Sequence, residues 1–579
     1  MPAKIMETYE IWASDPYFSK ETREELSKIR DNDSEISERF YKYLEFGTGG
    51  LRGIIGAGTN RMNIYTVALV TEGFARYIDG LDAGCKAKGI VISYDSRHFS
   101  REFAMVSALV FATHGIKVYF SDEIRPTPML SYAVRYFGTI GGVMITASHN
   151  PAKYNGYKAY GEDGGQMPPD AADIILSSMS SIEDVRSVCW ITEEEAAMKG
   201  LLVYFGEKLD RDYISMLKKL SINNEAILQN SDMKIVYTPL HGTGNKPVRR
   251  ILKEIGFTNV ITVPEQEHPD PDFSTVVSPN PEERSALALA LALAQKTDAE
   301  LVVATDPDGD RTGLAIRDKS GEYVILSGNQ IGILLLEYIL KAKKKLDRLP
   351  SDSFAITTIV STKLSRLIAA KYDIELFEVL TGFKFIAEII KEYDECGDMH
   401  FQFGFEESFG FLAGTDVRDK DAIVTVMLIA EMAAAARSAG KTLYDSLQEL
   451  FIEYGYAAEK TISITYEGKE GIEKINNAMK LLREYKGDVI NDIRIKGISD
   501  YLLSNRTDFT SGMNTPIDLE KSNVLCYQMD GLDWFGIRPS GTEPKIKIYF
   551  GIYNRNEQAC NDRLEYVSSH IERFVRDFL

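Results

Sequence analysis

Short apolar runs alternate with helix-patterned stretches along most of the chain. Gly89–Tyr94 (GIVISY) is a β-branched run of the kind that forms a buried parallel strand, and a helical pattern follows at Arg101–Thr113. The pattern then gives a strand at Lys117–Phe120, a helix at Pro126–Phe137 and a strand at Gly142–Thr146. This alternation predicts an α/β fold.

The same order of elements occurs twice more. The second round has strands at Met233–Leu240, Asn259–Val263 and Leu301–Ala304, with helices at Lys246–Ile255 and Glu282–Ala294. The third round has strands at Phe354–Val360, Ile374–Leu380 and Phe401–Phe403, with helices at Leu364–Lys371 and Phe383–Tyr393. Each round ends in a polar loop at the C-terminal end of a strand, which is where open α/β sheets bind ligands.

The last part of the chain has a different pattern. From about Gly455 the alternation fades, and a strand at Ile546–Phe550 and a helix at Glu557–Phe578 close the sequence. We therefore predict three similar α/β domains with mixed sheets and a fourth α+β domain. For 579 residues at about 150 per domain, the predicted boundaries are 1–200, 201–315, 316–450 and 451–579. Glu7–Glu45, at the start, is charged and helix-leaning.

Composition is that of a globular protein, with 44% apolar and 26% charged residues. The net charge is −19, from 66 basic and 85 acidic side chains. Nucleic acids and anionic membrane surfaces recruit basic proteins, so we expect neither as a partner. An anionic ligand would need cations concentrated locally at its site.

The cysteines and the apolar runs indicate a cytoplasmic protein. Five cysteines, without any C-x-x-C pair, suit neither a disulfide framework nor a zinc site: Cys85, Cys189, Cys396, Cys526 and Cys560. Reduced thiols are expected in the cytosol. No apolar run reaches the roughly 18 residues of a membrane span, and Met1–Glu10 lacks the apolar core of a signal peptide.

An acidic loop predicts a metal site. Asp306, Asp308 and Asp310 follow a strand at every second position, separated by a proline and a glycine. Three carboxylates this close repel one another without a cation, and hard cations prefer oxygen ligands. An EF-hand would need glycine and glutamate where Arg311 and Arg317 stand, so the calcium-loop interpretation fails.

The loop Thr146–Pro151 (TASHNP) places a serine and a histidine at a strand end. The G-x-S-x-G elbow of a hydrolase nucleophile is absent. A serine that accepts and returns a phosphoryl group fits better beside a metal loop, because a cation must neutralise the transferring group. From the loop alone, Ser148 in a simple turn hydrogen bond remains an equal alternative.

Two further loops carry polar groups suited to a sugar phosphate. Arg538–Lys545 offers a guanidinium, two hydroxyls, a glycine and a lysine, which can grip a phosphate. Gly404–Gly410 (GFEESFG) offers adjacent carboxylates as acceptors for sugar hydroxyls. A plain surface turn and a solvated acidic loop are the respective structural alternatives.

Taken in order, these four segments resemble the α-D-phosphohexomutase superfamily, in particular its phosphoglucomutase members. Thr48–Gly53 and Thr381–Lys384 add supporting matches, and no loop departs from the family's pattern. The resemblance extends from about Glu45 to Lys547. It implies four domains around a central active-site cleft.

The resemblance also implies an activity. Ser148 would carry a phosphoryl group and interconvert α-D-glucose 1-phosphate and glucose 6-phosphate, with glucose 1,6-bisphosphate as intermediate and activator. One Mg²⁺ per site would be held by an oxygen of Ser148 and by Asp306, Asp308 and Asp310. A phosphopentomutase or phosphomannomutase of the same superfamily is the alternative. The expected partners are small sugar phosphates, and the expected state is a monomer or a dimer.

The remaining site residues follow from the same resemblance. Glu406 and Ser408 would read sugar hydroxyls. The non-reacting phosphate would be held by Arg538, Ser540, Gly541, Thr542 and Lys545. Substrate contacts are also expected from Arg311, Thr381, Gly382, Arg418 and Lys420.

Proton transfer is assigned by resemblance to Lys158, with Lys384 as the second possibility. Simple attraction of phosphate is the alternative for each lysine. A lysine works near neutral pH only when its pKa is depressed, and Arg52 and Arg311 would supply that influence. His149 is expected to position the loop.

Two other classes of protein are less consistent with the sequence. A metal-dependent phosphatase would not need a separate loop for a second phosphate. A non-catalytic paralogue would tolerate losses at Ser148 or at the aspartates, and none is seen.

Overall fold

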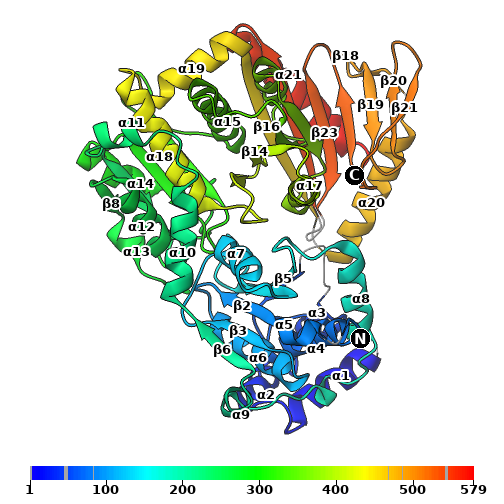
Figure 1. Ribbon diagram of the computed structural model, residues 1–579. Coiled ribbons are helices and arrows are strands. Elements are labelled where there is room, and N and C mark those ends of the chain that lie inside the picture. The colour runs from blue at the N-terminus through cyan, green and yellow to red at the C-terminus, as the bar shows by residue number, and fades with distance from the viewer. Residues whose placement is uncertain (1–2, 45–49, 83, 467, 486, 541–544) are drawn as a thin grey trace. The chain divides into compact units, whose positions relative to one another are not determined.

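A computed structural model describes residues 3–44, 50–82, 84–466, 468–485, 487–540 and 545–579 (Figure 1). Backbone contacts divide the chain into two compact units, which are described separately. The first unit comprises Met1–Leu326, Ala387–Phe401 and Phe409–Gly440, and the second comprises Ser327–Ile386, Gln402–Ser408 and Lys441–Leu579.

The first unit begins with three short helices and a mixed sheet of six strands. The helices are α1 (Ala3–Ser14), α2 (Lys20–Ser27) and α3 (Asp33–Phe40). The strands, in sheet order, are β1 (Gly50–Ile54), β5 (Tyr154–Gly161), β4 (Gly141–Ile145), β2 (Ile90–Tyr94), β3 (Val118–Ser121) and β6 (Leu202–Phe205). β2, β3, β4 and β6 run parallel, whereas β5 is antiparallel to β4 and to β1. Every residue of β2 and β4 is buried, as expected of strands covered on both faces.

Helices cover this sheet. They are α4 (Ile64–Asp79), α5 (Cys85–Lys88), α6 (Ser100–Thr113), α7 (Thr127–Phe137), α8 (Pro169–Ser180) and α9 (Glu193–Met198). α6 and α7 both pack on β2 and β4, and α4 packs against α6 and α8. The resulting core joins β2, β3 and β4 to these helices through buried aliphatic and aromatic side chains.

A second mixed sheet lies in the first unit. Its order is β11 (Tyr323–Ile325), β10 (Thr312–Arg317), β9 (Leu301–Thr305), β7 (Ile235–Thr238) and β8 (Val260–Thr262). The accompanying helices are α10 (Glu207–Lys218), α11 (Asn224–Gln229), α12 (Asn245–Ile255), α13 (Pro264–Glu267), α14 (Ala288–Thr297) and α18 (Ala422–Ser438). α18 contacts β9, β10, α11 and α12, although more than a hundred residues separate it from them in the sequence.

The second unit begins with a parallel strand pair and three helices. β12 (Ser353–Thr358) pairs with β13 (Glu375–Val379). The helix α16 (Leu364–Tyr372) packs on β13, on α15 (Gly328–Lys345) and on α19 (Leu443–Tyr454). α17 (Phe383–Cys396) starts in this unit, and β14 (His400–Phe405) ends in it. The strand β14 leads directly into the loop that contains Glu406.

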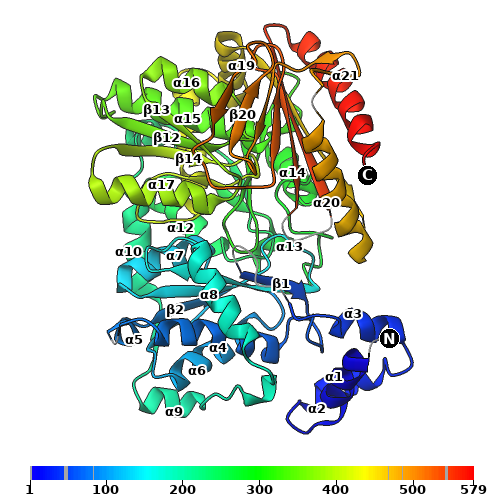
Figure 2. The same ribbon diagram turned by 90° about the vertical axis from the view of Figure 1, so that its right-hand side faces the viewer.

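The C-terminal part of the second unit is a sheet of seven strands. In order they are β16 (Tyr456–Thr465), β24 (Lys545–Asn554), β23 (Trp534–Pro539), β22 (Leu525–Gln528), β19 (Gly497–Asp500), β20 (Asn505–Asp508) and β21 (Asn514–Pro516). α20 (Gly468–Glu484) and α21 (Glu557–Arg576) pack on one face (Figure 2). The other face carries Trp534, Tyr549 and Tyr501 and packs on Ile359 and Val360. A two-stranded ribbon joins β17 (Val489–Ile490) to β18 (Ile493–Arg494).

The predicted fold class is confirmed: three α/β regions with mixed sheets precede a β-rich fourth region. The domain boundaries stay a prediction. One helix is misplaced, because α14 begins at Ala288 and not at Glu282. Residues 282–287 form turns that follow Asn280, whose side chain accepts a hydrogen bond from the backbone of Glu282 at 3.2 Å.

The structure also contains strands that were not predicted, among them β6, which runs parallel to β3. β5, β10 and β11 were not predicted, because the strand–helix alternation identifies only strands that are separated by helices. Within the described part of the chain, no single helix has the length and hydrophobicity of a membrane span, and only the bent pair α18 and α19 together meets both criteria.

Candidate active site

Ser148 stands three residues beyond β4 in an unusual backbone conformation. Its φ is 51°, in the left-handed region that non-glycine residues rarely adopt. The hydroxyl of Thr146 accepts a hydrogen bond from the backbone N–H of Ser148 at 2.8 Å, and Ser148 is only 3% exposed. A strained, buried serine at a strand end indicates a functional site.

Arg97 fixes the loop that carries Ser148. Its guanidinium donates to the carbonyls of Ser148 and Asn150 at 2.5 Å each, and to those of Pro151 and Tyr154 at 3.0 and 3.1 Å. The Arg97 side chain is fully buried and lies 3.3 Å from Asp95. One side chain therefore satisfies four backbone acceptors of this loop.

The three predicted aspartates lie together at the end of β9. One carboxylate oxygen from each of Asp306, Asp308 and Asp310 lies within 4.8 Å of the others, and all three residues are buried. The hydroxyl of Ser148 donates to Asp306 Oδ2 at 2.6 Å. Gly309 has φ +67°, and a Cβ there would lie 2.8 Å from Cβ of Pro126, so the turn requires glycine.

The charge of this cluster is only partly balanced. Burial and then the neighbouring carboxylates raise the pKa of Asp306 well above its ordinary value. Burial also acts to raise the pKa of Asp310, but Lys158, Lys420 and Arg311 outweigh it and lower that pKa. Asp308 Oδ1 and Asp310 Oδ1 are buried and accept no hydrogen bond from the described residues. Unsatisfied, converging carboxylate oxygens fit a hard divalent cation, so the chain carries a metal site.

Lys158 lies on β5 and points at the aspartates. Its Nζ is 2.7 Å from Asp308 Oδ2 and 3.1 Å from Asp310 Oδ2. Burial lowers the pKa of Lys158, but Asp308 and Asp310 outweigh it, and the pKa ends above its ordinary value. This direction is opposite to the predicted one, because the nearest charges are these carboxylates and not Arg52 and Arg311.

The other predicted cations of the first unit are held by neighbours. Arg52 donates to Asn150 Oδ1 at 2.8 Å, and Arg311 pairs with Glu282. Lys420 lies 2.8 Å from Asp419 and 3.4 Å from Asp310.

His149 and Arg418 both contact neighbouring protein groups. Burial, followed by Arg311 and Arg52, lowers the pKa of His149 well below its ordinary value, so the ring is neutral. Its Nδ1 lies 3.3 Å from Ser148 Oγ. Arg418 is 2% exposed, donates to the Thr415 carbonyl at 2.7 Å and pairs with Asp394. Its guanidinium is thus engaged in a buried ion pair.

The second unit holds the predicted sugar loop. Glu406 Oε1 accepts from the backbone N–H of Gly382 at 3.0 Å, and Glu406 Oε2 accepts from the Ser408 hydroxyl at 3.2 Å. The hydroxyl of Thr381 is buried and lacks a hydrogen-bond partner in the described part. Lys384 Nζ lies 4.5 Å from the ring centroid of Phe385. Thr381, Gly382, Glu406 and Ser408 therefore form one polar cluster.

The predicted phosphate loop is described in part. Arg538 is the penultimate residue of β23, and the backbone N–H of Ser540 donates to the carbonyl of Lys545 at 2.7 Å. Gly541 and Thr542 lie outside the described residues.

Several contributors were not predicted. Arg97 and Asp95 anchor the Ser148 loop, the Thr127 hydroxyl donates to Asp308 Oδ2 at 2.9 Å, and Tyr160 donates to Asp419 Oδ2 at 2.9 Å. The sequence did offer a signal for Arg97, because Asp95-Ser96-Arg97 follows β2 and so stands at the same sheet edge as the Ser148 loop.

The fold and this geometry define a class: α/β proteins with a candidate metal site of three buried carboxylates next to a buried serine. Comparisons with known proteins identify the family. Three family models match, described as domains I, II and III, each alpha/beta/alpha, of phosphoglucomutase/phosphomannomutase, over residues 43–186, 211–321 and 327–454.

Curated relatives agree along nearly the whole chain. A phosphoglucomutase of Staphylococcus aureus (strain USA300) is 40% identical over 527 residues, which is 90% of this chain and 92% of that protein. The phosphoglucomutase of strain MRSA252 is 39% identical over 523 residues. The chain therefore belongs to the phosphoglucomutase/phosphomannomutase family, as the sequence motifs predict.

Solved structures show the same fold. Parafusin (pp63), a phosphoglucomutase from Paramecium in its open form, has a TM-score of 0.67 at 16% identity, covering 92% of this chain and 95% of that one. A putative phosphomannomutase from Thermus thermophilus has a TM-score of 0.66 at 22% identity, covering 91% and 99%.

Proposed function

We propose that the protein is a phosphoglucomutase, which interconverts α-D-glucose 1-phosphate and glucose 6-phosphate through phosphorylated Ser148 and glucose 1,6-bisphosphate. The observation that carries the proposal is the Ser148 hydroxyl, held 2.6 Å from Asp306 within a cluster of three buried carboxylates. The 40% identity to phosphoglucomutases supports glucose over mannose or a pentose as the sugar.

In each half-reaction the phosphorus–oxygen bond to one hydroxyl breaks as a bond to the other forms. The phosphoryl group leaves Ser148 Oγ for a sugar hydroxyl, which loses its proton, while Ser148 Oγ gains one. The left-handed backbone at Ser148 and the four hydrogen bonds from Arg97 fix the position of this oxygen before the reaction. The second half-reaction returns the other phosphate of the bisphosphate to Ser148.

Asp306, Asp308 and Asp310 would hold Mg²⁺, whose charge would offset that on the transferring phosphoryl group. We assign proton transfer to Lys158. Its Nζ lies 2.7 Å from Asp308 Oδ2 and 3.1 Å from Asp310 Oδ2, so it stands beside the cluster where the phosphoryl group would be transferred. Lys384, in the second unit, stays the second possibility.

The remaining assignments concern substrate binding. Glu406 and Ser408, with Thr381 and Gly382, would read the sugar hydroxyls. Arg538, Ser540 and Lys545, with Gly541 and Thr542, would hold the non-reacting phosphate. The negative charge of that phosphate would be balanced by Arg52, Arg311 and Lys420. His149 would position the Ser148 loop.

Replacement of the serine tests the mechanism. Ser148→Ala should lower turnover of glucose 1-phosphate by a factor of about 10⁴ or more, because no other group can carry the phosphoryl group. Ser177→Ala, at an exposed position of α8, is the matched control and should retain full activity. Undiminished turnover by Ser148→Ala, with glucose 1,6-bisphosphate supplied, would refute the mechanism.

Parallel assays with glucose, mannose and ribose 1-phosphates test the choice of sugar. We expect the highest kcat/KM with glucose 1-phosphate. A higher value with ribose or mannose 1-phosphate would assign the chain to the phosphopentomutase or phosphomannomutase alternative and leave the role of Ser148 intact.

A further inference from the structure

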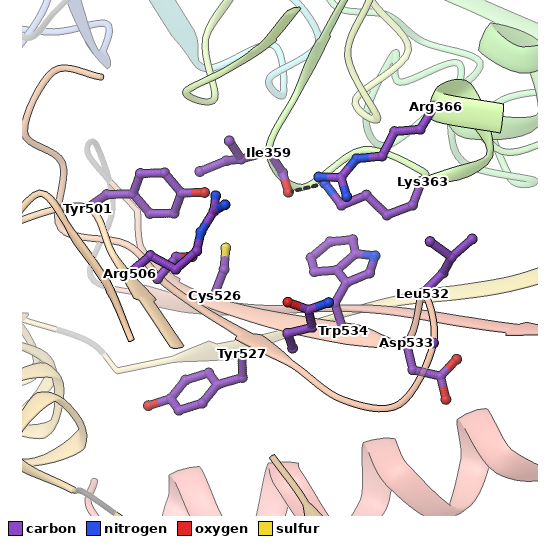
Figure 3. Close-up of a pocket in the computed structure, with 13 residues that line it drawn as sticks. Ile359, Lys363, Arg366, Tyr501, Arg506, Cys526, Tyr527, Leu532, Asp533 and Trp534 are labelled. Carbon is purple, nitrogen blue, oxygen red and sulfur yellow. Dashed lines mark hydrogen bonds between the residues drawn. The ribbon is translucent and has the colours of Figure 1, made fainter. Parts of the chain in front are cut away.

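The second unit contains a pocket that the proposed mechanism does not use (Figure 3). It lies on the face of the seven-stranded sheet opposite α20 and α21, and its cavity volume is about 110 Å³. One wall comes from β19, β20 and β22, and the other comes from Ile359 and the start of α16. Arg538, Ser540 and Lys545 do not line it.

Cations stand on both sides of this pocket. Lys363 and Arg366 share Glu378: Lys363 Nζ is 2.7 Å from Glu378 Oε1, and Arg366 donates to Glu378 Oε2 at 3.0 Å through Nε. Arg506, on the opposite wall, donates from Nε to the Ser499 hydroxyl at 3.1 Å and has no ion pair within the described part. One carboxylate thus faces three cations, and the pocket carries a net positive charge.

The wall that carries Arg506 also offers a hydroxyl group to a ligand. Tyr501 is 6% exposed, and its hydroxyl has no hydrogen-bond partner among the described residues. In Figure 3 this hydroxyl points toward the Arg506 guanidinium. This hydroxyl keeps some contact with solvent, so it can donate a hydrogen bond to a ligand that enters the pocket.

The floor of the pocket carries no opposing charge. Burial raises the pKa of the Cys526 thiol to about 12, so the sulfur is neutral at physiological pH. Asp533 points away from the pocket and pairs with Arg563 at 2.6 Å (Figure 3). The indole of Trp534 lies 5.2 Å from Lys363 Nζ and forms an apolar surface next to the cations.

We propose that this pocket is a second phosphate-binding site, held by Arg506, Lys363 and the Tyr501 hydroxyl and separate from the Arg538 loop. Guanidinium groups bind phosphate through paired hydrogen bonds, and cations on two walls suit an anion that accepts from several directions. Free inorganic phosphate and the phosphate of a sugar monophosphate share this chemistry.

Alkylation of Cys526 gives a local readout, since this thiol lines the pocket. Full-length protein is treated with N-ethylmaleimide, with and without inorganic phosphate at constant ionic strength, and each cysteine is quantified by peptide mass spectrometry. We expect phosphate to slow modification of Cys526 about fivefold or more and to leave the exposed Cys189 unaffected. Equal rates at Cys526 with and without phosphate would overturn the proposal.

Two variants and their controls separate specific binding from a general effect. Arg506→Gln and Tyr501→Phe should each raise the phosphate concentration needed for protection about tenfold. Arg494→Gln, at an exposed arginine outside the pocket, and Tyr566→Phe, at an exposed tyrosine of α21, should leave it unchanged. If Arg506→Gln left the protecting phosphate concentration unchanged, the proposal would also be overturned.

A parallel titration with glucose 6-phosphate distinguishes the two sources. Protection at lower concentration than with inorganic phosphate would identify a sugar phosphate, and the reverse order would identify free phosphate. Protection by neither would refute the site. Because no turnover is measured, failure here leaves the proposed function untouched.

Discussion

Arg97 has the strongest single influence on the Ser148 loop. Arg97→Lys would leave up to three of its four carbonyl acceptors unsatisfied, at about 1–3 kcal/mol each. We therefore expect a loss of several kcal/mol in unfolding free energy, measured with urea, and a fall in kcat larger than any rise in KM. The exposed Arg30→Lys should behave like the wild type. A fully active and equally stable Arg97→Lys variant would contradict this role.

Metal binding also depends on single residues, the three aspartates of the loop after β9. Because three buried carboxylates repel one another, Mg²⁺ should raise the melting temperature of the protein, and a chelator should abolish turnover. Asp308→Asn should reduce that Mg²⁺-dependent shift by more than half. The control is Asp318→Asn, at an exposed turn after β10. Full activity in excess chelator would exclude the metal role.

Single residues also mark the limit of prediction from sequence. Ser148 and the aspartates were found because loop chemistry and strand position are local properties of the chain. The roles of Arg97 and Arg418 depend on partners elsewhere in the chain, the Ser148 loop and Asp394. The position of Arg97 after β2 indicates its sheet edge, but no local pattern reveals the hydrogen bonds that either arginine makes. The pKa direction of Lys158 failed for the same reason, since Asp308 is 150 positions away.

At the scale of elements, a histidine ties α6 to α4. His114 follows α6, and its ring nitrogens lie 2.8 Å from Glu72 and 2.7 Å from Asp79, both on α4. The hydrogen bond that Glu72 accepts from the ring raises the pKa of His114; burial opposes this rise, but Asp79 adds to it. Arg76 and Lys86 also face these carboxylates, at 2.8 Å each.

This arrangement predicts a pH dependence of stability. Since the folded-state pKa of His114 is raised, its contribution is complete below the unfolded value of about 6.5 and is lost as pH rises through the folded pKa. His114→Gln should lower the unfolding free energy by about 2 kcal/mol at pH 5.5 and by less at pH 9. Urea titrations of both proteins at both pH values measure this, with the exposed His268→Gln as control. A constant difference between pH values would rule it out.

Elements were predicted well where strand and helix alternate and poorly elsewhere. β2, β7, β9 and β12 were found within two residues of their observed bounds. α14 was extended too far because its alanine- and leucine-rich sequence has high helix propensity, yet residues 282–287 form turns and Glu282 pairs with Arg311. Most strands of the seven-stranded sheet were missed because consecutive strands pair antiparallel there with no helix between them.

For the whole molecule, the two units predict separate responses to ligands. The metal site lies in the first unit and the proposed second phosphate site in the second. Mg²⁺ should slow amide hydrogen exchange in the loops after β4 and β9 and leave β19, β20 and β22 unchanged. Phosphate, in the presence of chelator, should protect β19, β20 and β22. Equal Mg²⁺ protection in both units would contradict the separation.

The late position of α18 in the sequence has a consequence for synthesis. Glu431 accepts hydrogen bonds from the backbone N–H groups of Ile222 and Asn223, at 3.0 Å each, and Asp421 accepts from the Tyr213 hydroxyl at 2.7 Å. The first unit therefore cannot close until residue 438 has left the ribosome, long after β9 and β10 have emerged. A nascent chain of about 330 residues would expose the apolar surface that α18 later covers, and would depend on chaperones at that stage.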